Sequence, residues 1–206
     1  MPEAVLIELE GVVVETRALR AESLRRGLEA IGIPDGTEPD ETERDLVALV
    51  AEREFAARAS AGLSLVDGAK ASILAMHAQT RLAVVTRASR RIADLVLELG
   101  DIADAFDCVI TVEDVRRPKP APEAYELALA RLGRRRPVAR ESCLALEDGP
   151  DGIRAARAAG VPCVAVGPIT VDEAFATGAH AWLPSLRGQS LLTLDELLKS
   201  GEEKAR

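Results

Sequence analysis

The sequence contains very few aromatic residues: one tryptophan, one tyrosine and three phenylalanines, or 2% of 206 residues. Hydrophobic residues nevertheless make up 48% of the chain. A buried core must therefore be built from alanine, valine, leucine and isoleucine. The length suits one large α/β domain, or one domain with a small insertion.

Positive charge is also scarce, because 26 lysines and arginines face 34 aspartates and glutamates, for a net charge of -8. Binding to a phosphate backbone needs a basic surface, so we expect no nucleic-acid partner. We interpret the densest basic cluster, Arg134 to Arg136, as a solvated loop. No apolar run approaches the ~20 residues of a transmembrane helix. The first residues also lack the features of a signal peptide, so we expect a cytoplasmic protein without membrane contact.

Histidine and cysteine are too few and too scattered for several kinds of site. The two histidines, His77 and His180, lie far apart in the sequence and give little material for a histidine metal site or a Ser-His-Asp triad. Cys108, Cys143 and Cys163 have no CxxC spacing that would indicate zinc. Each lies in an apolar run, so we expect reduced cysteines in the core.

The hydrophobic pattern alternates between strands and helices. Short apolar runs bounded by turn residues are typical of buried strands, and apolar residues at helical spacing predict helices between them. Strands are predicted at residues 5–7, 81–86, 107–111, 143–147, 161–166 and near 181–183, with helices at about 68–78, 89–99, 122–132 and 153–159. This alternation predicts an α/β fold with a doubly wound, mostly parallel sheet.

Residues 17–62 interrupt this alternation. The first part has apolar residues at helical spacing before Gly32, and Asp40 with Glu43 resembles a capping box that begins a second helix. We therefore predict a core formed by residues 1–16 and 63–200 and a short helical insert of two helices. Residues 201–206 are predicted to be a disordered tail.

Polar and charged side chains follow the predicted strands where each strand ends. They are Glu8 and Glu10 after the first strand, Thr86 after the second, Lys119 after the third, and Glu147 and Asp148 after the fourth. Open α/β sheets bind their ligands at this edge. Carboxylates there can hold Mg²⁺, while a hydroxyl and an ammonium group can bind a phosphoryl group. For the first strand alone, an edge strand with a solvated acidic tip is an equally good interpretation.

Four motifs in this order resemble the haloacid dehalogenase (HAD) superfamily, and within it the β-phosphoglucomutase-like phosphatases. They are IELEGVVVET, LAVVTRAS, RRPKPAPEAY and CLALEDGPDGIRAARAAG, which together span nearly the whole chain. The resemblance implies a HAD-like Rossmannoid core, with the insert as a shortened helical cap. It also implies a Mg²⁺-dependent phosphatase that acts on a small phosphorylated metabolite.

The resemblance further implies a role for each site residue. Glu8 takes the position of the nucleophile and Glu10 that of the acid/base. Thr86 and Lys119 take the phosphate-binding positions, and Arg87 is either a further phosphate contact or a solvated arginine. The implied metal ligands are Glu8, Glu10, Glu147 and Asp148.

The family pattern has aspartate where this chain has Glu8, Glu10 and Glu15. Each replacement moves a carboxylate about 1.5 Å further from its backbone, and a misplacement of ~1 Å can cost on the order of 100-fold in rate. The alternative to a phosphatase is therefore a weakened or inactive relative that keeps the metal and phosphate site for binding or assembly.

Overall fold

The computed structural model describes residues 1–34, 36–134 and 136–204. The chain forms two compact units, one made of Met1–Val14 and Leu65–Arg206 and the other of Glu15–Ser64. The boundaries expected from the sequence, 16/17 and 62/63, differ from these by two residues. The larger unit is the α/β core, and the smaller unit is the helical insert.

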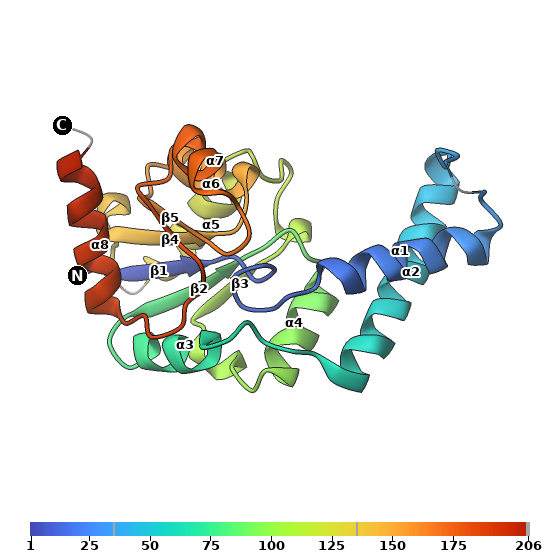
Figure 1. Ribbon diagram of the computed structural model, residues 1–206, viewed down its shortest axis with the longest axis horizontal. Helices are drawn as coiled ribbons and strands as arrows, with labels where there is room; N and C mark the ends of the chain where they lie inside the picture. Colours follow the sequence, from blue (N-terminus) through green and yellow to red (C-terminus); the bar gives the residue numbers. More distant parts are fainter. Residues whose placement is uncertain (35, 135, 205–206) are drawn as a thin grey trace. The chain divides into compact units, whose positions relative to one another are not determined.

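The core contains a six-stranded sheet in which every strand is parallel to its neighbours (Figure 1). The strands are β1 (Ala4–Ile7), β2 (Arg81–Val85), β3 (Cys108–Ile110), β4 (Cys143–Glu147), β5 (Cys163–Val166) and β6 (Ala181–Leu183), in the order β3-β2-β1-β4-β5-β6. The predicted α/β class is confirmed, and the sheet is parallel throughout. Each predicted strand is present, and β2, β3 and β5 are one or two residues shorter than predicted.

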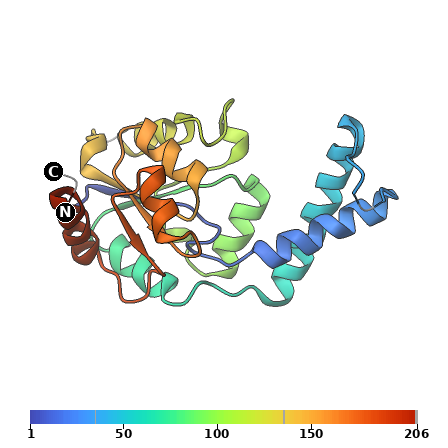
Figure 2. The ribbon, with the colours of Figure 1, turned by 45° about the horizontal axis from the view of Figure 1, so that its top comes forward.

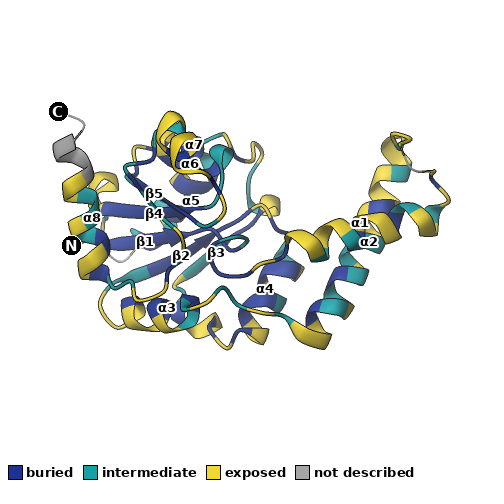
Figure 3. Cartoon of the chain, viewed as in Figure 1, coloured by how far each residue is buried: buried dark blue, intermediate teal, exposed yellow. Residues whose placement is uncertain are grey.

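The central strands are buried along their whole length, as Figure 3 shows. Ile7 lies opposite Val84 on one side and Leu146 on the other, so β1 is paired along both edges. Continuous apolar runs suit parallel strands, because helices cover both faces of such a sheet.

Helices lie on both faces of the sheet (Figures 1 and 2). One face carries α3 (Ala69–His77) and α4 (Arg90–Leu99), and the other carries α5 (Glu123–Leu132), α6 (Pro150–Ala158) and α7 (Val171–Thr177). Short 3-10 turns occur at Ala103–Ala105, Val112–Asp114 and Arg140–Ser142. The Ser89 side chain accepts a hydrogen bond from the Ile92 amide and so caps α4.

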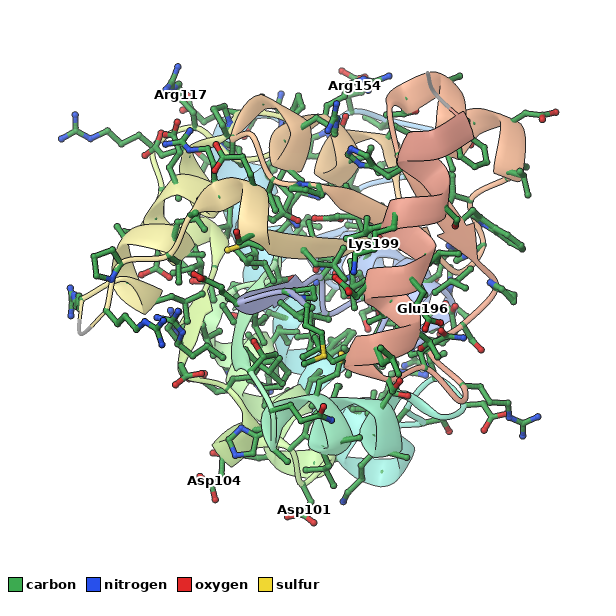
Figure 4. The ribbon with its side chains drawn as sticks, turned by 90° about the vertical axis from the view of Figure 1, so that its left-hand side faces the viewer. Asp101, Asp104, Arg117, Arg154, Glu196 and Lys199 are labelled. Atoms are coloured by element: carbon green, nitrogen blue, oxygen red, sulfur yellow. The ribbon has the colours of Figure 1, made fainter. Side chains whose placement is uncertain are left out.

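Two helices, α7 and α8 (Leu191–Lys204), lie outside the predicted elements. Ser190 and Thr193 cap the beginning of α8 with two reciprocal hydrogen bonds. The Thr193 amide donates to Ser190 Oγ at 3.2 Å, and the Ser190 amide donates to Thr193 Oγ1 at 2.8 Å. The exposed face of α8 carries Glu196 and Lys199 (Figure 4). The helix includes the first four residues of the predicted disordered tail, 201–206, and residues 205–206 lie outside the described residues.

The three cysteines are free thiols: Cys143 and Cys163 are buried, and Cys108 is partly buried. Burial raises the pKa of the Cys108 and Cys143 thiols to about 11. They are therefore protonated at neutral pH, which suits the core role expected from the sequence.

The insert consists of α1 (Arg17–Ile31) and α2 (Glu41–Gly62), the two helices predicted. Asp40 and Glu43 form a complete capping box, because each side chain accepts a hydrogen bond from the other's backbone amide at 2.8 and 2.9 Å. The helices pack closely at Gly27, where a Cβ atom would lie 2.8 Å from the Val47 carbonyl oxygen. Within the described residues, no helix is both long enough and apolar enough to span a bilayer.

One carboxylate, Asp114, ties the turn after β3 to two helices. Its oxygens accept hydrogen bonds from the Thr111 amide at 2.8 Å, from Arg90 Nη2 on α4 at 2.6 Å and from Arg131 Nη2 on α5 at 2.7 Å. Partial burial opposes ionisation, but the hydrogen bonds from Thr111 and Arg131 lower the pKa of Asp114 to about 2. The ionised form is therefore the one that the fold stabilises.

We expect Asp114→Asn to lower the free energy of unfolding at pH 7 by about 1–2 kcal/mol, after allowance for solvent screening. A carboxyl whose pKa is lower in the folded state stabilises the fold above its unfolded pKa of ~3.9. The difference between wild type and variant should thus shrink as the pH falls from about 4 towards 2. Urea unfolding at several pH values measures it. The control is Asp94→Asn, because Asp94 is exposed and lies 3.8 Å from Arg90 Nη1. An equal effect in both variants would contradict the assignment.

Candidate active site

The strand order places a crevice at the C-terminal end of β1. The strand lies between β2 and β4, so the connections on its two sides run in opposite directions along the sheet. Such a switch point is where open α/β sheets bind ligands. Glu8 directly follows β1, Thr86 directly follows β2, and Glu147 is the last residue of β4. A cavity of about 290 Å³ opens here, lined by Glu8, Arg87, Lys119, Glu147, Asp148, Gly149, Pro150, Asp151, Gly152 and Arg154.

The Lys119 ammonium group is the centre of this site and is almost wholly buried. It donates to Glu8 Oε2 at 2.7 Å, to the Val85 carbonyl oxygen at 2.8 Å and to Glu147 Oε1. These acceptors come from the ends of β1, β2 and β4, so one ammonium group joins three neighbouring strands. Burial by itself would lower the pKa of Lys119, but the charges of Glu147 and Glu8 hold it well above its usual range. The group is therefore a permanent cation.

Glu147 is 1% exposed and faces the interior of the core. Its Oε1 atom accepts hydrogen bonds from Lys119 and from the hydroxyl of Tyr125 on α5. Its Oε2 atom packs against Gly152 on α6, where a Cβ atom would lie only 1.8 Å away. Burial raises the pKa of Glu147 to about 7. The charge of Lys119 lowers this pKa, whereas the charge of Glu8, which shares the same ammonium group, raises it.

The Glu8 carboxylate turns back over the backbone that follows it. Its Oε1 atom accepts from the Leu9 amide at 2.7 Å and is 3.4 Å from the Glu10 amide, while Oε2 is bound by Lys119. The chain then turns at Gly11, which has a φ of 77° and is closed by a hydrogen bond from its amide to the Val14 carbonyl oxygen. Glu8 is thus a fixed carboxylate with 5% exposure at the base of the cavity.

Asp148 lies against this turn. A Cβ atom at Gly11 would come within 2.3 Å of Asp148 Oδ2, so only glycine allows the two segments to approach this closely. Burial, and then the charge of Glu8, raise the pKa of the Asp148 carboxyl to about 6. Glu8 and Asp148 line the same cavity, and this donor set suits Mg²⁺, which needs only one or two carboxylates plus water and substrate oxygens.

The four predicted metal ligands do not all gather at one point. Among the described residues, no group of three or more histidines, cysteines, aspartates or glutamates is placed to hold a metal ion. Adjacent residues at a strand end point to opposite sides, so Glu147 faces Lys119 and Tyr125 while Asp148 faces the turn at Gly11. Glu8 and Glu10 lie in the turn that follows β1, which ends at Ile7.

Of the remaining predicted site residues, Arg87 lines the cavity, whereas Thr86 and Glu10 do not belong to its described lining. Thr86 is buried, and its Oγ1 atom accepts a hydrogen bond from the Ala88 amide at 3.2 Å. Arg87 lies at the cavity rim, 60% exposed, with its Nη1 atom 3.3 Å from Asp151 Oδ2.

Sequence reasoning missed three residues of the site: Tyr125, Gly152 and Arg154. Tyr125 is the last letter of the motif RRPKPAPEAY and the one tyrosine of the chain. Its position six residues after Lys119 places its hydroxyl group on the same buried carboxylate. Gly152 was one letter of a motif, and its role became visible only through the packing of Glu147.

Comparison with known proteins gives consistent matches. A model of the haloacid dehalogenase-like hydrolase family matches residues 5–160. Validoxylamine A 7'-phosphate phosphatase from Streptomyces hygroscopicus subsp. limoneus is 30% identical over 198 residues, which cover 85% of this chain and 91% of that protein. Fructose-1-phosphate phosphatase YqaB from Escherichia coli (strain K12) is 36% identical over 104 residues, which cover 50% of this chain and 51% of YqaB.

Among solved structures, a CbbY variant from Rhodobacter sphaeroides in complex with xylulose-(1,5)bisphosphate has a TM-score of 0.83 at 26% identity. The match covers 94% of this chain and 99% of that chain. The chain spans only about half the length of the first curated relatives that it matches, namely 42% and 51% of their residues.

The contact between Gly152 and Glu147 predicts that Gly152→Ala destabilises the core. The added methyl group would displace a buried, hydrogen-bonded carboxylate, and we expect a loss of about 1–3 kcal/mol in the free energy of unfolding. The matched control is Gly149→Ala, because Gly149 has a φ of -154° and a Cβ atom there would meet no atom within 4 Å. Urea unfolding of both variants checks this. If Gly149→Ala costs as much as Gly152→Ala, the carboxylate contact does not explain the loss.

Tyr125→Phe tests the second contact of Glu147. Removing the hydroxyl group leaves a buried carboxylate with one donor fewer, and hydrogen bonds to charged groups are worth about 1.5–3 kcal/mol. We expect a loss of that size in the wild-type background and a much smaller loss in a Glu147→Gln background. A double-mutant cycle measured by chemical unfolding gives the coupling. Purely additive effects would show that the hydroxyl group acts elsewhere.

Proposed function

The chain belongs to the haloacid dehalogenase-like hydrolases, and from this membership we propose that it is a Mg²⁺-dependent phosphatase that acts on a small phosphate monoester. The observation that supports this most is the buried Lys119, which is held between Glu8 and Glu147 at the switch point of the sheet. Two of the relatives described above carry phosphatase names, and the CbbY structure holds a sugar bisphosphate. A phosphorylated sugar or a similarly small metabolite is therefore the proposed substrate class.

In the proposed reaction, a Glu8 carboxylate oxygen attacks the substrate phosphorus in line and forms an acyl-phosphate as the ester oxygen leaves. Glu10 gives a proton to the leaving alcohol and later takes one from the water that hydrolyses the acyl-phosphate. Lys119 offsets the negative charge that develops on the phosphoryl oxygens, with Thr86 as a hydroxyl donor. Water returns Glu8 to its free carboxylate and releases inorganic phosphate.

The residues that would hold Mg²⁺ are Glu8 and Asp148, which line the same cavity. When bound, the ion supplies positive charge that polarises the phosphoryl group. Glu147 has another role in this proposal: it holds Lys119 in place, because its Oε1 atom is bound by Lys119 and Tyr125.

A second candidate function is binding of metal and phosphate without efficient turnover, as in a weakened or inactive relative of the phosphatases. The hydrogen bonds that Lys119 already makes favour this candidate. An ammonium group has three N–H donors, and all three of Lys119 are bound to Glu8, Val85 and Glu147. A phosphoryl oxygen can bind Lys119 only if one of these bonds is given up. The bond to Glu8 is the one to exchange, since Glu8 lies at the base of the cavity and Glu147 is also held by Tyr125.

The side chain at position 8 distinguishes the two candidates. We expect the wild-type protein with Mg²⁺ to hydrolyse members of a panel of sugar phosphates and p-nitrophenyl phosphate. Glu8→Gln should reduce kcat/KM by at least roughly 100-fold, because an amide is a poor nucleophile. Release of inorganic phosphate provides the measurement, and unfolding curves confirm that the variant is folded.

Glu8→Asp tests whether a side chain shorter by one methylene group raises the activity. If the wild type is as inert as Glu8→Gln while Glu8→Asp gains activity, the natural protein is the weakened relative and the phosphatase proposal fails. If both the wild type and Glu8→Asp turn over the same esters, the extra methylene group is tolerated and the proposal stands.

A further inference from the structure

Two arginines at the rim of the cavity share a single carboxylate. Arg87 follows the end of β2, and Arg154 lies on the first turns of α6. Arg87 Nη1 is 3.3 Å from Asp151 Oδ2, and Arg154 Nη1 is 3.4 Å from Asp151 Oδ1. All three side chains line the cavity that contains Glu8 and Lys119. Arg154 lies at the molecular surface (Figure 4).

These contacts are too weak to be structural. The side chains of Arg87 and Arg154 are 60% and 58% exposed, and that of Asp151 is 43% exposed. Exposed ion pairs contribute only ~0–1 kcal/mol. Asp114, another carboxylate of the core that binds two arginines, has distances of 2.6 and 2.7 Å and an additional bond from the Thr111 amide. The rim arrangement is therefore a pair of cations loosely held near one anion.

The charges inside the cavity differ from those at its rim. Among the described lining residues, the inner part has one cation, Lys119, with all its donors used, and three carboxylates, Glu8, Glu147 and Asp148. The rim has two guanidinium groups and one carboxylate, so it keeps one positive charge in excess. Guanidinium groups bind phosphate and carboxylate through paired N–H donors, and two of them side by side suit an anion with several oxygens.

We infer that Arg87 and Arg154 bind a second anionic group of the substrate, so that the preferred substrate is a short phosphate ester that carries another phosphate or a carboxylate. This inference rests on the proposed phosphatase function. The cavity volume of about 290 Å³ lies just below the usual range of small-molecule sites, roughly 300–1,000 Å³, so the two anionic groups are a few bonds apart. The second group replaces the Asp151 carboxylate, which occupies the arginines in its absence.

Pairs of substrates that differ only in the second anion test this. Glycerol 3-phosphate and 3-phosphoglycerate differ by a carboxylate, and fructose 1-phosphate and fructose 1,6-bisphosphate differ by a phosphate. We expect wild-type kcat/KM to be higher for the doubly anionic member of at least one pair, and the pair that shows it identifies the group. Arg154→Ala should reduce that ratio roughly ten-fold or more, mainly through KM, because a charge-assisted pair of hydrogen bonds is lost.

Two further variants sharpen the test. Asp151→Asn removes the competing anion and should change the same ratio in the opposite direction, which a merely structural role would not produce. Arg157→Ala is the matched control, since Arg157 lies on the same helix but contacts His180 Nε2 at 2.8 Å, away from the cavity. It should leave both members of each pair as in the wild type.

Failure of the inference is distinguishable from failure of the proposed function. If the wild type hydrolyses both members of each pair equally, or if Arg154→Ala reduces both equally, the second anion site is overturned and the phosphatase stands. If no ester is hydrolysed, the phosphatase proposal fails. Calorimetric titration with 3-phosphoglycerate and glycerol 3-phosphate in the presence of Mg²⁺ then decides the site by the same comparison of wild type, Arg154→Ala and Asp151→Asn.

Discussion

A buried ammonium group with more than one carboxylate partner determines how this core is assembled. Lys119 binds Glu8, Glu147 and the Val85 carbonyl oxygen, which belong to three neighbouring strand ends. A buried charge is costly unless it is paired and hydrogen-bonded, so these ends must stay in register for the cation to remain inside. Tyr125 adds α5 to the network through its bond to Glu147. The electrostatics of one side chain thus link the sheet to the helices that cover it.

The same bonds that hold the site together use the Lys119 donors that would bind the phosphoryl group in the proposed reaction. Lys119 has no N–H group left, and Glu8 is bound both by Lys119 and by the Leu9 amide. Functional sites commonly keep groups in arrangements that a stable core alone would not select. In the proposed reaction, substrate binding therefore requires an exchange of partners at Lys119. The longer side chain of Glu8 affects this exchange directly, since it determines whether the carboxylate reaches phosphorus after leaving the ammonium group.

Charge is distributed along the depth of the cavity. Carboxylates dominate its base, where Asp148 lies beside the turn at Gly11, and this part suits a cation. Guanidinium groups of Arg87 and Arg154 lie at the rim, where they suit an anion. A substrate with two anionic ends, one of them accompanied by Mg²⁺, is complementary to this gradient. Electrostatic complementarity of this kind sets orientation and specificity more than total affinity.

The sequence by itself determined the α/β class, the two helices of the insert and the strand ends that carry Glu8 and Glu147, because hydrophobic period, caps and turn residues are local signals. The tertiary structure decided what each side chain faces. Adjacent positions at a strand end point to opposite sides, so Glu147 binds Tyr125 and Lys119, and among the described residues the predicted ligands are not gathered into a group of three or more carboxylates placed for one metal ion. Such contacts join segments far apart in the chain, and no local pattern records them.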